Sequence, residues 1–362
     1  MSGANYRYLL NSSSGKENCF RVEAECIVHS SKWNRTAIAK LNSKIEAVAI
    51  VKPYFSVLIP TYNREQHIRQ SVDSVLAQTW NDFELFVIDD GSTDGTQDAL
   101  AQYGSRIHVI EQENQGPEVA RNRAALQARG DYLVFLDSDD LLFPRALETY
   151  ARVIQACDSP PLIIGSMTYF LDGNLPRLDE KSGSEIKVMR FPDYLSKDVS
   201  VDLSNSEIVI RKSSFEEIGG LRKTSSTTFH LDDINLILKA GAQSPCVVLL
   251  EPKTVAYRAH ATNSIRNPKA MVDGILSIIA SEKKGEYPGG RERRWDRRAC
   301  IGGISQRWIY ISLKVWKPGQ ALRLFFKSVP MLAAIACKRI HLKLRRKTPP
   351  FVVGKDINLR MQ

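Results

Sequence analysis

Short apolar runs alternate with helix-like spacings along residues 54–136. Phe55-Ser-Val-Leu-Ile59 is rich in β-forming residues and stops at Pro60, as expected of a buried parallel strand. The alternation predicts strands at 55–59, 83–88, 107–110 and 132–136, and helices at 64–78, 96–103 and 117–128. Strands and helices in this order are typical of βαβ units, so we predict an α/β fold with a Rossmann-like, mostly parallel mixed sheet flanked by helices.

The pattern continues less regularly beyond residue 141. We predict a helix to about residue 157, strands at 162–167, 207–210 and 246–250, and a short helix at 232–240. Residues 170–206 are polar and irregular, which favours a loop-rich acceptor region. We therefore divide the chain into a poorly determined extension (1–52), a main domain (53–270) and a basic helical C-terminal extension (271–362).

Charge is distributed unevenly over the 362 residues. The net charge is +10, but residues 291–347 contain 16 Lys or Arg and only two acids, which leaves the remainder at −4. A mildly acidic body with a basic tail suggests a catalytic domain that sits against an anionic surface. The six scattered cysteines have no spacing that suits zinc or a disulfide scaffold, so we expect a reducing compartment.

No secretory signal is evident near Met1, and no run of eighteen apolar residues occurs, so we expect no transmembrane helix. The basic tail mixes aromatic and aliphatic residues with bases, notably at 308–316 and 321–327. That composition is typical of amphipathic helices in a membrane interface, here divided into short helices by Pro318 and Pro330. The alternative is a helical bundle that packs on the main domain with its bases in solvent.

Polar residues follow three of the predicted strands directly. They are Thr61-Tyr62-Asn63, Asp89-Asp90 and Asp137-Ser138-Asp139-Asp140. In open α/β sheets, ligands bind outside the carboxyl ends of the strands. We therefore expect the three groups to line one edge of the sheet and to form a ligand site.

Asp137, Asp139 and Asp140 place three carboxylates within four residues, where their charges repel. One interpretation is a solvated acidic turn before a helix. The other is a site for Mg²⁺ or Mn²⁺ that leaves coordination positions for diphosphate oxygens. The two neighbouring polar strand ends favour the metal site.

Two further segments each have two interpretations. Asp89 and Asp90 form either a turn into a helix cap or acceptors for a nucleobase imide and a ribose hydroxyl. Arg121 lies in a helix that follows Gly116; it is either a solvated base or part of a loop that closes over a nucleotide. No GxGxxG follows the first strand, which disfavours an NAD-binding domain.

Together these segments resemble the family 2 glycosyltransferases with the GT-A fold, over residues 55–264. The resemblance is carried, in order, by Ile59-Pro-Thr-Tyr-Asn63, Ser74-Val-Leu-Ala-Gln-Thr79, Val87-Ile-Asp-Asp-Gly-Ser-Thr-Asp-Gly-Thr96, Asn114-Gln-Gly116, Ala120-Arg-Asn122 and Phe135-Leu-Asp-Ser-Asp-Asp140. It implies an inverting transfer of a sugar from a nucleotide-diphosphate donor, with a UDP-sugar favoured, to an acceptor hydroxyl.

The resemblance also assigns roles to single residues. Pro60, Thr61, Asn63 and Asp90 would meet the base and ribose, Asp139 the ribose or the metal, and Asp140 would be the main metal ligand. A pair of acids that opens a later helix, here Asp232-Asp233, would supply the catalytic base, with Asp233 at the base position. Arg258 would support the diphosphate, and His260 would approach the metal or the diphosphate.

The sequence departs from the family pattern around the catalytic base, where Asp232, Asn235 and Lys239 replace a usual Glu, Asp and Arg. Residues 223–228 lack the family's aromatic, Gly-rich acceptor loop. We expect a saccharide or lipid-linked acceptor in cell-surface polysaccharide or glycolipid synthesis, and a cytoplasmic protein at the inner face of an anionic membrane. The alternatives are a nucleotide-sugar-binding protein and a nucleotidyltransferase; a nucleic-acid binder would not explain the polar strand ends.

Overall fold

The computed structural model describes residues 52–176, 185–196, 203–221, 231–242, 245–260, 263, 267–345 and 356–360. The chain forms two compact units, Met1–Val51 and Lys52–Gln362, and the description below concerns the second. Residues 1–51 of the predicted extension, and residues 223–228, where the family has its acceptor loop, lie outside the described residues.

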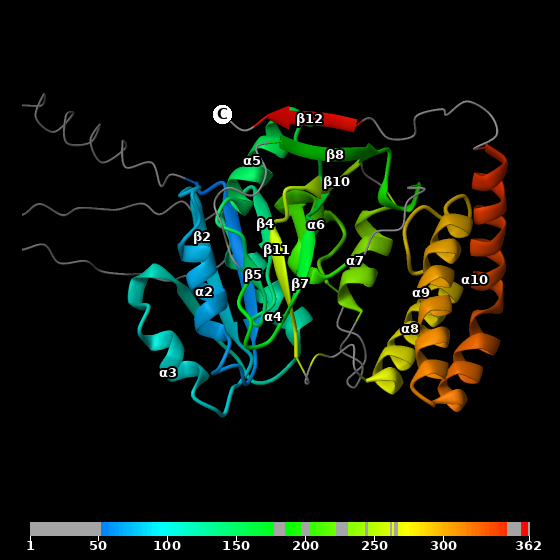
Figure 1. The fold of residues 1–362 in the computed structure, drawn as a ribbon, viewed down its shortest axis with the longest axis horizontal. Coiled ribbons are helices and arrows are strands. Elements are labelled where there is room, and N and C mark those ends of the chain that lie inside the picture. The colour runs from blue at the N-terminus through cyan, green and yellow to red at the C-terminus, as the bar shows by residue number, and fades with distance from the viewer. Residues whose placement is uncertain are drawn as a thin grey trace, which may run out of the picture. The chain divides into compact units, whose positions relative to one another are not determined.

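A nine-stranded sheet forms the centre of the described unit (Figure 1). Its order is β12 (Asp356–Arg360), β8 (Glu185–Phe191), β10 (Cys246–Glu251), β6 (Leu162–Ile164), β9 (Ile208–Arg211), β4 (Tyr132–Phe135), β1 (Phe55–Thr61), β2 (Phe83–Asp89) and β3 (His108–Glu111). Of these nine, β8 and β9 run against the other seven. The prediction of a mixed, mostly parallel sheet is confirmed.

Both faces of this sheet are covered, because side chains alternate between them along each strand. Val57 and Ile59 belong to one buried cluster with α2 (Ile68–Leu76), α3 (Thr96–Ala101) and α5 (Ala146–Ala156). Leu58, between them, belongs to the other cluster, with α4 (Pro117–Gln127), α6 (Lys212–Glu217) and α7 (Asp232–Ala240). Two-sided burial explains why the strands are almost uniformly apolar.

A second sheet stands beside the carboxyl ends of the first. It contains β5 (Leu141–Leu142), β11 (Val255–Ala259) and β7 (Met167–Leu171), with β11 in the middle. β11 runs antiparallel to β5 and parallel to β7. This small sheet brings residues from 141, 170 and 258 together near one edge of the large sheet.

The prediction of a loop-rich segment at 170–206 is wrong in part. β7 extends to Leu171, and β8 pairs with β10 inside the large sheet. β8 was missed although its residues alternate as in a half-buried strand: Ile186 and Val188 are buried, whereas Lys187 between them is exposed. The predicted strand at 162–167 is likewise divided between β6 and β7.

Three C-terminal helices, α8 (Pro268–Lys284), α9 (Arg294–Lys314) and α10 (Pro318–Arg345), share the core cluster that contains α4 and α7. A methyl group added at Gly302 of α9 would lie 2.0 Å from the carbonyl oxygen of Met331, so α9 and α10 cross in close contact. Tyr287 Oη donates to Asn235 Oδ1 of α7 at 3.0 Å, which ties the extension to the sheet's helical cover.

The expectation that Pro330 divides the tail into short helices is wrong, since α10 continues through it. Pro330 is exposed and lacks the N–H that would reach the carbonyl of Phe326, but burial of Ser328 and Met331 on either side holds the helix together. Residues 318–341 of α10 form a helix long and apolar enough to cross a membrane by length and composition, with a mean hydropathy of 1.3 and 28% of it buried.

Glu84 of β2 is buried and connects three segments of the sheet's amino-terminal edge. It accepts hydrogen bonds from Ser56 Oγ at 2.6 Å, Arg129 N at 2.5 Å and Gly130 N at 3.3 Å. Burial by itself raises the pKa of Glu84, but the bonds from Ser56 and Arg129 outweigh it and hold the pKa below its ordinary 4.5. Gly130 is required here because a Cβ would lie 2.6 Å from Ser56 N.

We expect Glu84→Ala to lower the free energy of unfolding by about 1–3 kcal/mol, because the buried donors of Ser56, Arg129 and Gly130 lose their acceptor. Because the pKa of Glu84 is lower in the folded state, the ionised side chain stabilises the fold above pH 4.5, and this advantage disappears as the pH falls through the lowered value. Urea unfolding at several pH values measures both effects. Glu216→Ala, at an exposed ion pair, is the control, and equal losses in the two variants would contradict the role of Glu84.

Candidate functional site

Three strand ends meet at one edge of the large sheet. Thr61 lies beside Asp89 in the parallel register of β1 and β2, and β4 runs parallel on the other side of β1. Asp90 N donates to the carbonyl of Thr61 at 2.8 Å, which fixes the first two ends against each other. Thr61 Oγ1 is buried without a hydrogen-bond partner in the described structure, so it remains a free donor and acceptor at this edge.

Asn63 and the two acids after β2 hold the loops above this edge. Asn63 has a φ of 51°, and its Oδ1 accepts from Thr93 N at 2.8 Å. Asp89 accepts from Ser92 N at 3.0 Å and from Gln97 Nε2 at 2.8 Å.

Asp90 holds the next loop in the same way. Its carboxylate accepts from Gln112 Nε2 at 2.7 Å and from the backbone N–H groups of Gln115 and Gly116 at 2.8 Å each. Of the two interpretations of these acids, the loop-forming one is therefore realised. Their carboxylates shape the edge at which the Thr61 hydroxyl is free.

Asp137–Asp140 form a tight turn between β4 and β5, closed by a bond from Asp140 N to the carbonyl of Asp137 at 3.1 Å. Asp140 is 1% exposed. Its Oδ2 accepts from Ser206 Oγ at 2.6 Å, and its Oδ1 accepts from Arg258 N at 2.9 Å. The turn is thereby joined to β11 and to the short helix at Asn205–Glu207.

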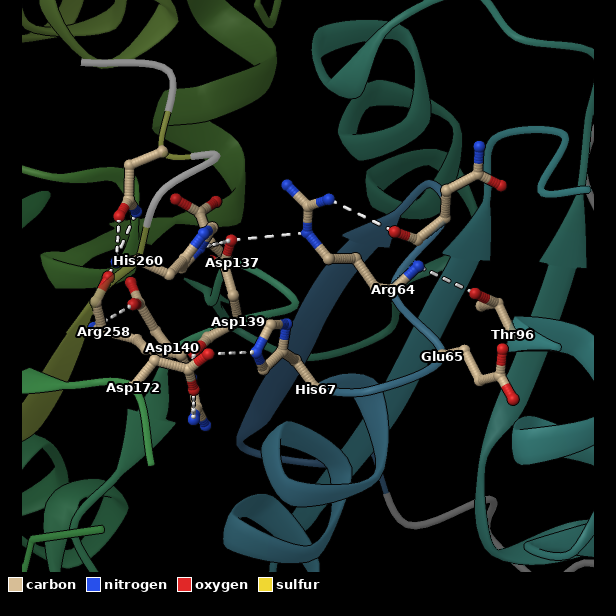
Figure 2. A network of polar contacts seen from close by, with 12 residues as sticks. Arg64, Glu65, His67, Thr96, Asp137, Asp139, Asp140, Asp172, Arg258 and His260 are labelled. Carbon is tan, nitrogen blue, oxygen red and sulfur yellow. Dashed lines mark hydrogen bonds and ion pairs between the residues drawn. The ribbon is translucent and has the colours of Figure 1, made fainter. Parts of the chain in front are cut away.

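Asp139 points toward the opening of the site, where Figure 2 shows it among basic side chains. Its Oδ2 lies 2.9 Å from His260 Nε2 and 3.4 Å from Arg64 Nε. The ring of His260 stacks on that of His67, with centroids 5.3 Å apart. Arg64 and His67 were missed from sequence, although they directly follow the first polar strand end.

Arg258 is enclosed by its own hydrogen-bond partners. It donates to the carbonyl of Asp139 at 2.6 Å, to Asp172 Oδ1 at 2.9 Å and to Gln70 Oε1 at 2.6 Å (Figure 2). Its guanidinium carbon lies 4.7 Å from the centre of the Phe170 ring. The structure thus places Arg258 beneath the acidic turn as a support, not at its open face.

Arg121 of α4 lies between two carboxylates that are far apart in sequence. Its side chain is 2% exposed, and it donates to Asp137 Oδ1 and, at 2.5 Å, to Asp232 Oδ2. Asn205 Nδ2 donates to the other oxygen of Asp232 at 2.9 Å. Neither interpretation of Arg121 from sequence foresaw this, because both partners come from other elements.

The Arg121 bridge brings Asp233 beside the acidic turn. Asp233 stands in the first turn of α7, is partly exposed, and accepts from Ile234 N at 2.7 Å. Burial, with repulsion from Asp232 and Asp137, raises the pKa of Asp233 well above its ordinary value. A carboxylate of raised pKa with an open side is suited to accept a proton.

The acids outnumber the bases that face them. Burial raises the pKa of Asp137 to about 6, despite Arg121, and raises that of Asp140 well above its ordinary value together with repulsion from Asp139 and Asp137. Burial also acts to raise the pKa of Asp139, but the bond from His260 and the charge of Arg64 hold it below its ordinary value. The turn is a site of excess negative charge.

The donors at this turn fit a hard divalent cation, since carboxylates and an imidazole are ligands that Mn²⁺ and Mg²⁺ accept. No group of three or more His, Cys, Asp or Glu in the described part of the chain already stands in ligand geometry. Asp139 and His260 already lie together at the open side, and a carboxylate oxygen of Asp140 retains a lone pair beside each bond it accepts.

A mostly parallel sheet with an acidic turn at its carboxyl edge, backed by a small second sheet, is the arrangement of the GT-A class of nucleotide-sugar enzymes. Residues 56–219 match the model of the family described as glycosyl transferase family 2. Over these residues the chain is similar to the family 2 glycosyltransferases, as its motifs predict, and its fold is of the GT-A class.

Two curated relatives illustrate the match. The putative teichuronic acid biosynthesis glycosyltransferase TuaG of Bacillus subtilis is 50% identical over 93 residues, which are 25% of this chain and 37% of that protein. The glycosyltransferase GlyG of Streptococcus pneumoniae is 29% identical over 188 residues, 51% of this chain and 56% of that protein. The alignments thus span less than two thirds of these relatives.

A crystal structure of residues 1–349 of S. aureus TarS in complex with UDP matches with a TM-score of 0.52. It is 20% identical and covers 69% of this chain and 70% of the TarS chain. At this identity, the likeness concerns the fold.

We expect Arg121→Met to lower the free energy of unfolding by about 3–5 kcal/mol, because Asp137 and Asp232 lose the charge that faces them. Arg123→Met on the same helix is the control, since Arg123 is exposed and donates only to the carbonyl of Glu111 in the described structure. Thermal and urea unfolding measure the difference, and equal stability of the two variants would contradict the bridge.

Proposed function

We propose that the protein is an inverting glycosyltransferase that moves a sugar from a nucleotide-diphosphate donor to an acceptor hydroxyl. The observation that carries the proposal is the Arg121 bridge, which brings the partly open carboxylate of Asp233 beside an acidic turn at the carboxyl edge of a parallel sheet. A proton acceptor and a cation site in one place are what a displacement at a sugar-diphosphate carbon requires.

The nucleoside would lie over the ends of β1 and β2. Pro60, Thr61 and Asn63 line this edge, and the free Thr61 hydroxyl is the group that a base or ribose would meet. Asp89 and Asp90 hold the surrounding loops, and we assign them contacts to the base and ribose through their remaining acceptor capacity. A uridine diphosphate donor is our choice, in keeping with the family resemblance and with the UDP bound by TarS.

Asp233 would take the acceptor proton as the acceptor oxygen attacks the anomeric carbon of the sugar. The bond from that carbon to the diphosphate oxygen breaks, the electron pair leaves with the diphosphate, and the configuration inverts. The raised pKa of Asp233 makes it a stronger base than an ordinary carboxylate.

Asp139, Asp140 and His260 would hold the Mg²⁺ or Mn²⁺. When bound, such an ion neutralises the charge that develops on the departing diphosphate. Asp137 would act mainly through Arg121, whose closed position gives it a positioning role in place of the nucleotide contact expected from sequence. Arg258 likewise supports the turn from below.

Cell-surface polysaccharide or glycolipid synthesis is the proposed setting, with a saccharide or lipid-linked acceptor at the cytoplasmic face of a membrane. TuaG is named as a putative teichuronic acid biosynthesis glycosyltransferase, and the present chain has a strongly basic helical extension. That extension would favour an anionic membrane surface.

Incubation with a panel of nucleotide-sugars and Mn²⁺ should release free nucleoside diphosphate from one of them, because the site presents both a cation position and a base. Asp233→Asn should retain donor binding by calorimetry and lose transfer by about 10²-fold or more, as removal of a general base does. Asp98→Asn, at an exposed acid of α3, is the control. Absence of turnover with every donor, or full activity of Asp233→Asn, would contradict the proposal.

Asp139→Asn and Asp140→Asn should each weaken Mn²⁺ binding about tenfold or more, because each removes a charged donor from the turn. Titration of the full chain followed by electron paramagnetic resonance of free Mn²⁺ measures this without reference to activity. Affinity unchanged in both variants would remove the turn as the cation site, whereas a loss confined to one variant would identify the ligand.

A further inference from the structure

α10 presents apolar side chains on two opposite sides. On the inner side, residues buried against α9 include Ala321, Leu324, Met331 and Ala334. On the outer side, exposed residues recur every three or four positions: Leu322, Phe326, Val329, Ala333, Ala336 and Ile340. We call this stripe, with Phe325 and with Leu313, Val315 and Trp316 at the turn from α9, the outer apolar surface.

A helix packed on a soluble domain normally has polar residues on its solvent side, and a helix that is apolar all round is normally enclosed. Here Trp316 is 88% exposed and Phe326 is 70% exposed. Contiguous exposed apolar side chains of this size mark a surface that another phase or molecule covers.

Basic side chains border the outer apolar surface. Lys314, Lys317 and Lys327 are exposed, and no carboxylate in the described ranges lies within ion-pair distance of them. The surrounding segment, residues 291–347, carries a net +14. A partner that covers this surface therefore needs an apolar interior and negative charge at the boundary of that interior.

We propose that the outer apolar surface docks onto an anionic lipid bilayer, with Trp316, Leu322 and Phe326 in the interface and the lysines at the headgroups. Aromatic residues and lysines in this arrangement are typical of helices that lie in a membrane interface. A second copy of the chain is a poorer partner, because two surfaces of like positive charge would face each other.

The inner side of α10 explains why the helix lies on the membrane instead of crossing it. Met331 is fully buried, and its carbonyl contacts Gly302 so closely that no side chain fits between α9 and α10. Crossing the bilayer would separate this contact and expose the core shared with α8 and α9. Only the outer side is therefore available to lipid.

Docking would also orient the site. Figure 1 shows the turn between α9 and α10 at the same end of the molecule as the carboxyl ends of β1 and β11, where the acidic turn lies. The site would then lie at the end of the docked surface, near the lipid in which a lipid-linked acceptor presents its hydroxyl. This consequence rests on the proposed function, whereas the docking itself does not.

Cosedimentation of the full chain with phosphatidylcholine vesicles, with and without phosphatidylglycerol, tests the docking. The wild type should bind the anionic vesicles, and binding should weaken with salt. Replacing Lys314, Lys317 and Lys327 by Gln should lower affinity for anionic vesicles roughly fivefold per base, on the order of a hundredfold in all. A variant with Trp316→Ser, Leu322→Ser and Phe326→Ser should lose binding to both compositions.

Leu126→Ser is the matched control, since Leu126 is 82% exposed on α4, away from this surface. Quenching of tryptophan emission by brominated lipid, present in the wild type and reduced in Trp316→Phe, gives a second measurement that requires no destabilising change. Absent vesicle binding, or binding equal in the serine variant and the wild type, would overturn the proposal. So would a wild-type dimer that the serine variant dissociates, because a second copy would then cover the surface.

The membrane and enzyme proposals fail separately. Asp233→Asn should bind vesicles as the wild type does, and the serine variant should still release nucleoside diphosphate from the donor in solution. Vesicle binding without any donor turnover would leave the docking intact and remove the transferase.

Discussion

The site depends on the ion pairs that the buried guanidinium of Arg121 makes with two carboxylates. One oxygen of Asp137, at the end of β4, and one of Asp232, at the start of α7, both accept from it. Without the guanidinium the two carboxylates would repel each other, and no charge would hold the two elements together. The bridge therefore brings together the acidic turn and the helix that carries Asp233.

Around this bridge, the site holds more carboxylates than basic side chains to pair with them. Asp140 is locked by Ser206 and by the backbone of Arg258, while Asp139 faces His260 and Arg64 at the opening. Burial, together with repulsion from the neighbouring carboxylates, raises the pKa values of Asp137 and Asp140. A divalent cation and a diphosphate would together balance the surplus of negative charge, which is the physical link between the fold and the proposed transfer.

The C-terminal helices differ from the sheet in how their apolar residues are covered. α8 and α9 complete the core on one face, so the extension is part of the described unit and not a loose tail. Only the inner side of α10 packs against that core. Its outer side also carries apolar residues, and these are exposed. Packing on the domain, one of the two alternatives posed from the sequence, is realised by the inner side of α10, and the proposed membrane contact concerns its outer side.

Local sequence patterns are sufficient to predict the class of fold and the edge of the sheet at which the candidate site lies. Uniformly apolar strands, alternating helices and polar residues after β1, β2 and β4 are local patterns, and the rule that ligands bind at carboxyl strand ends converts them into a site. Thr61, Asp139, Asp140 and Asp233 were all reached in this way or through the motifs they belong to.

Which polar groups face one another, by contrast, depends on the three-dimensional packing of the chain. The pairing of Arg121 with Asp232 spans over a hundred residues, and the supporting roles of Arg258 and Asp172 depend on a small second sheet that no local pattern indicated. The continuity of α10 through Pro330 depends on burial against α9. Local pattern encodes periodicity and burial, whereas the partner of a buried charge is set by the packing of distant segments.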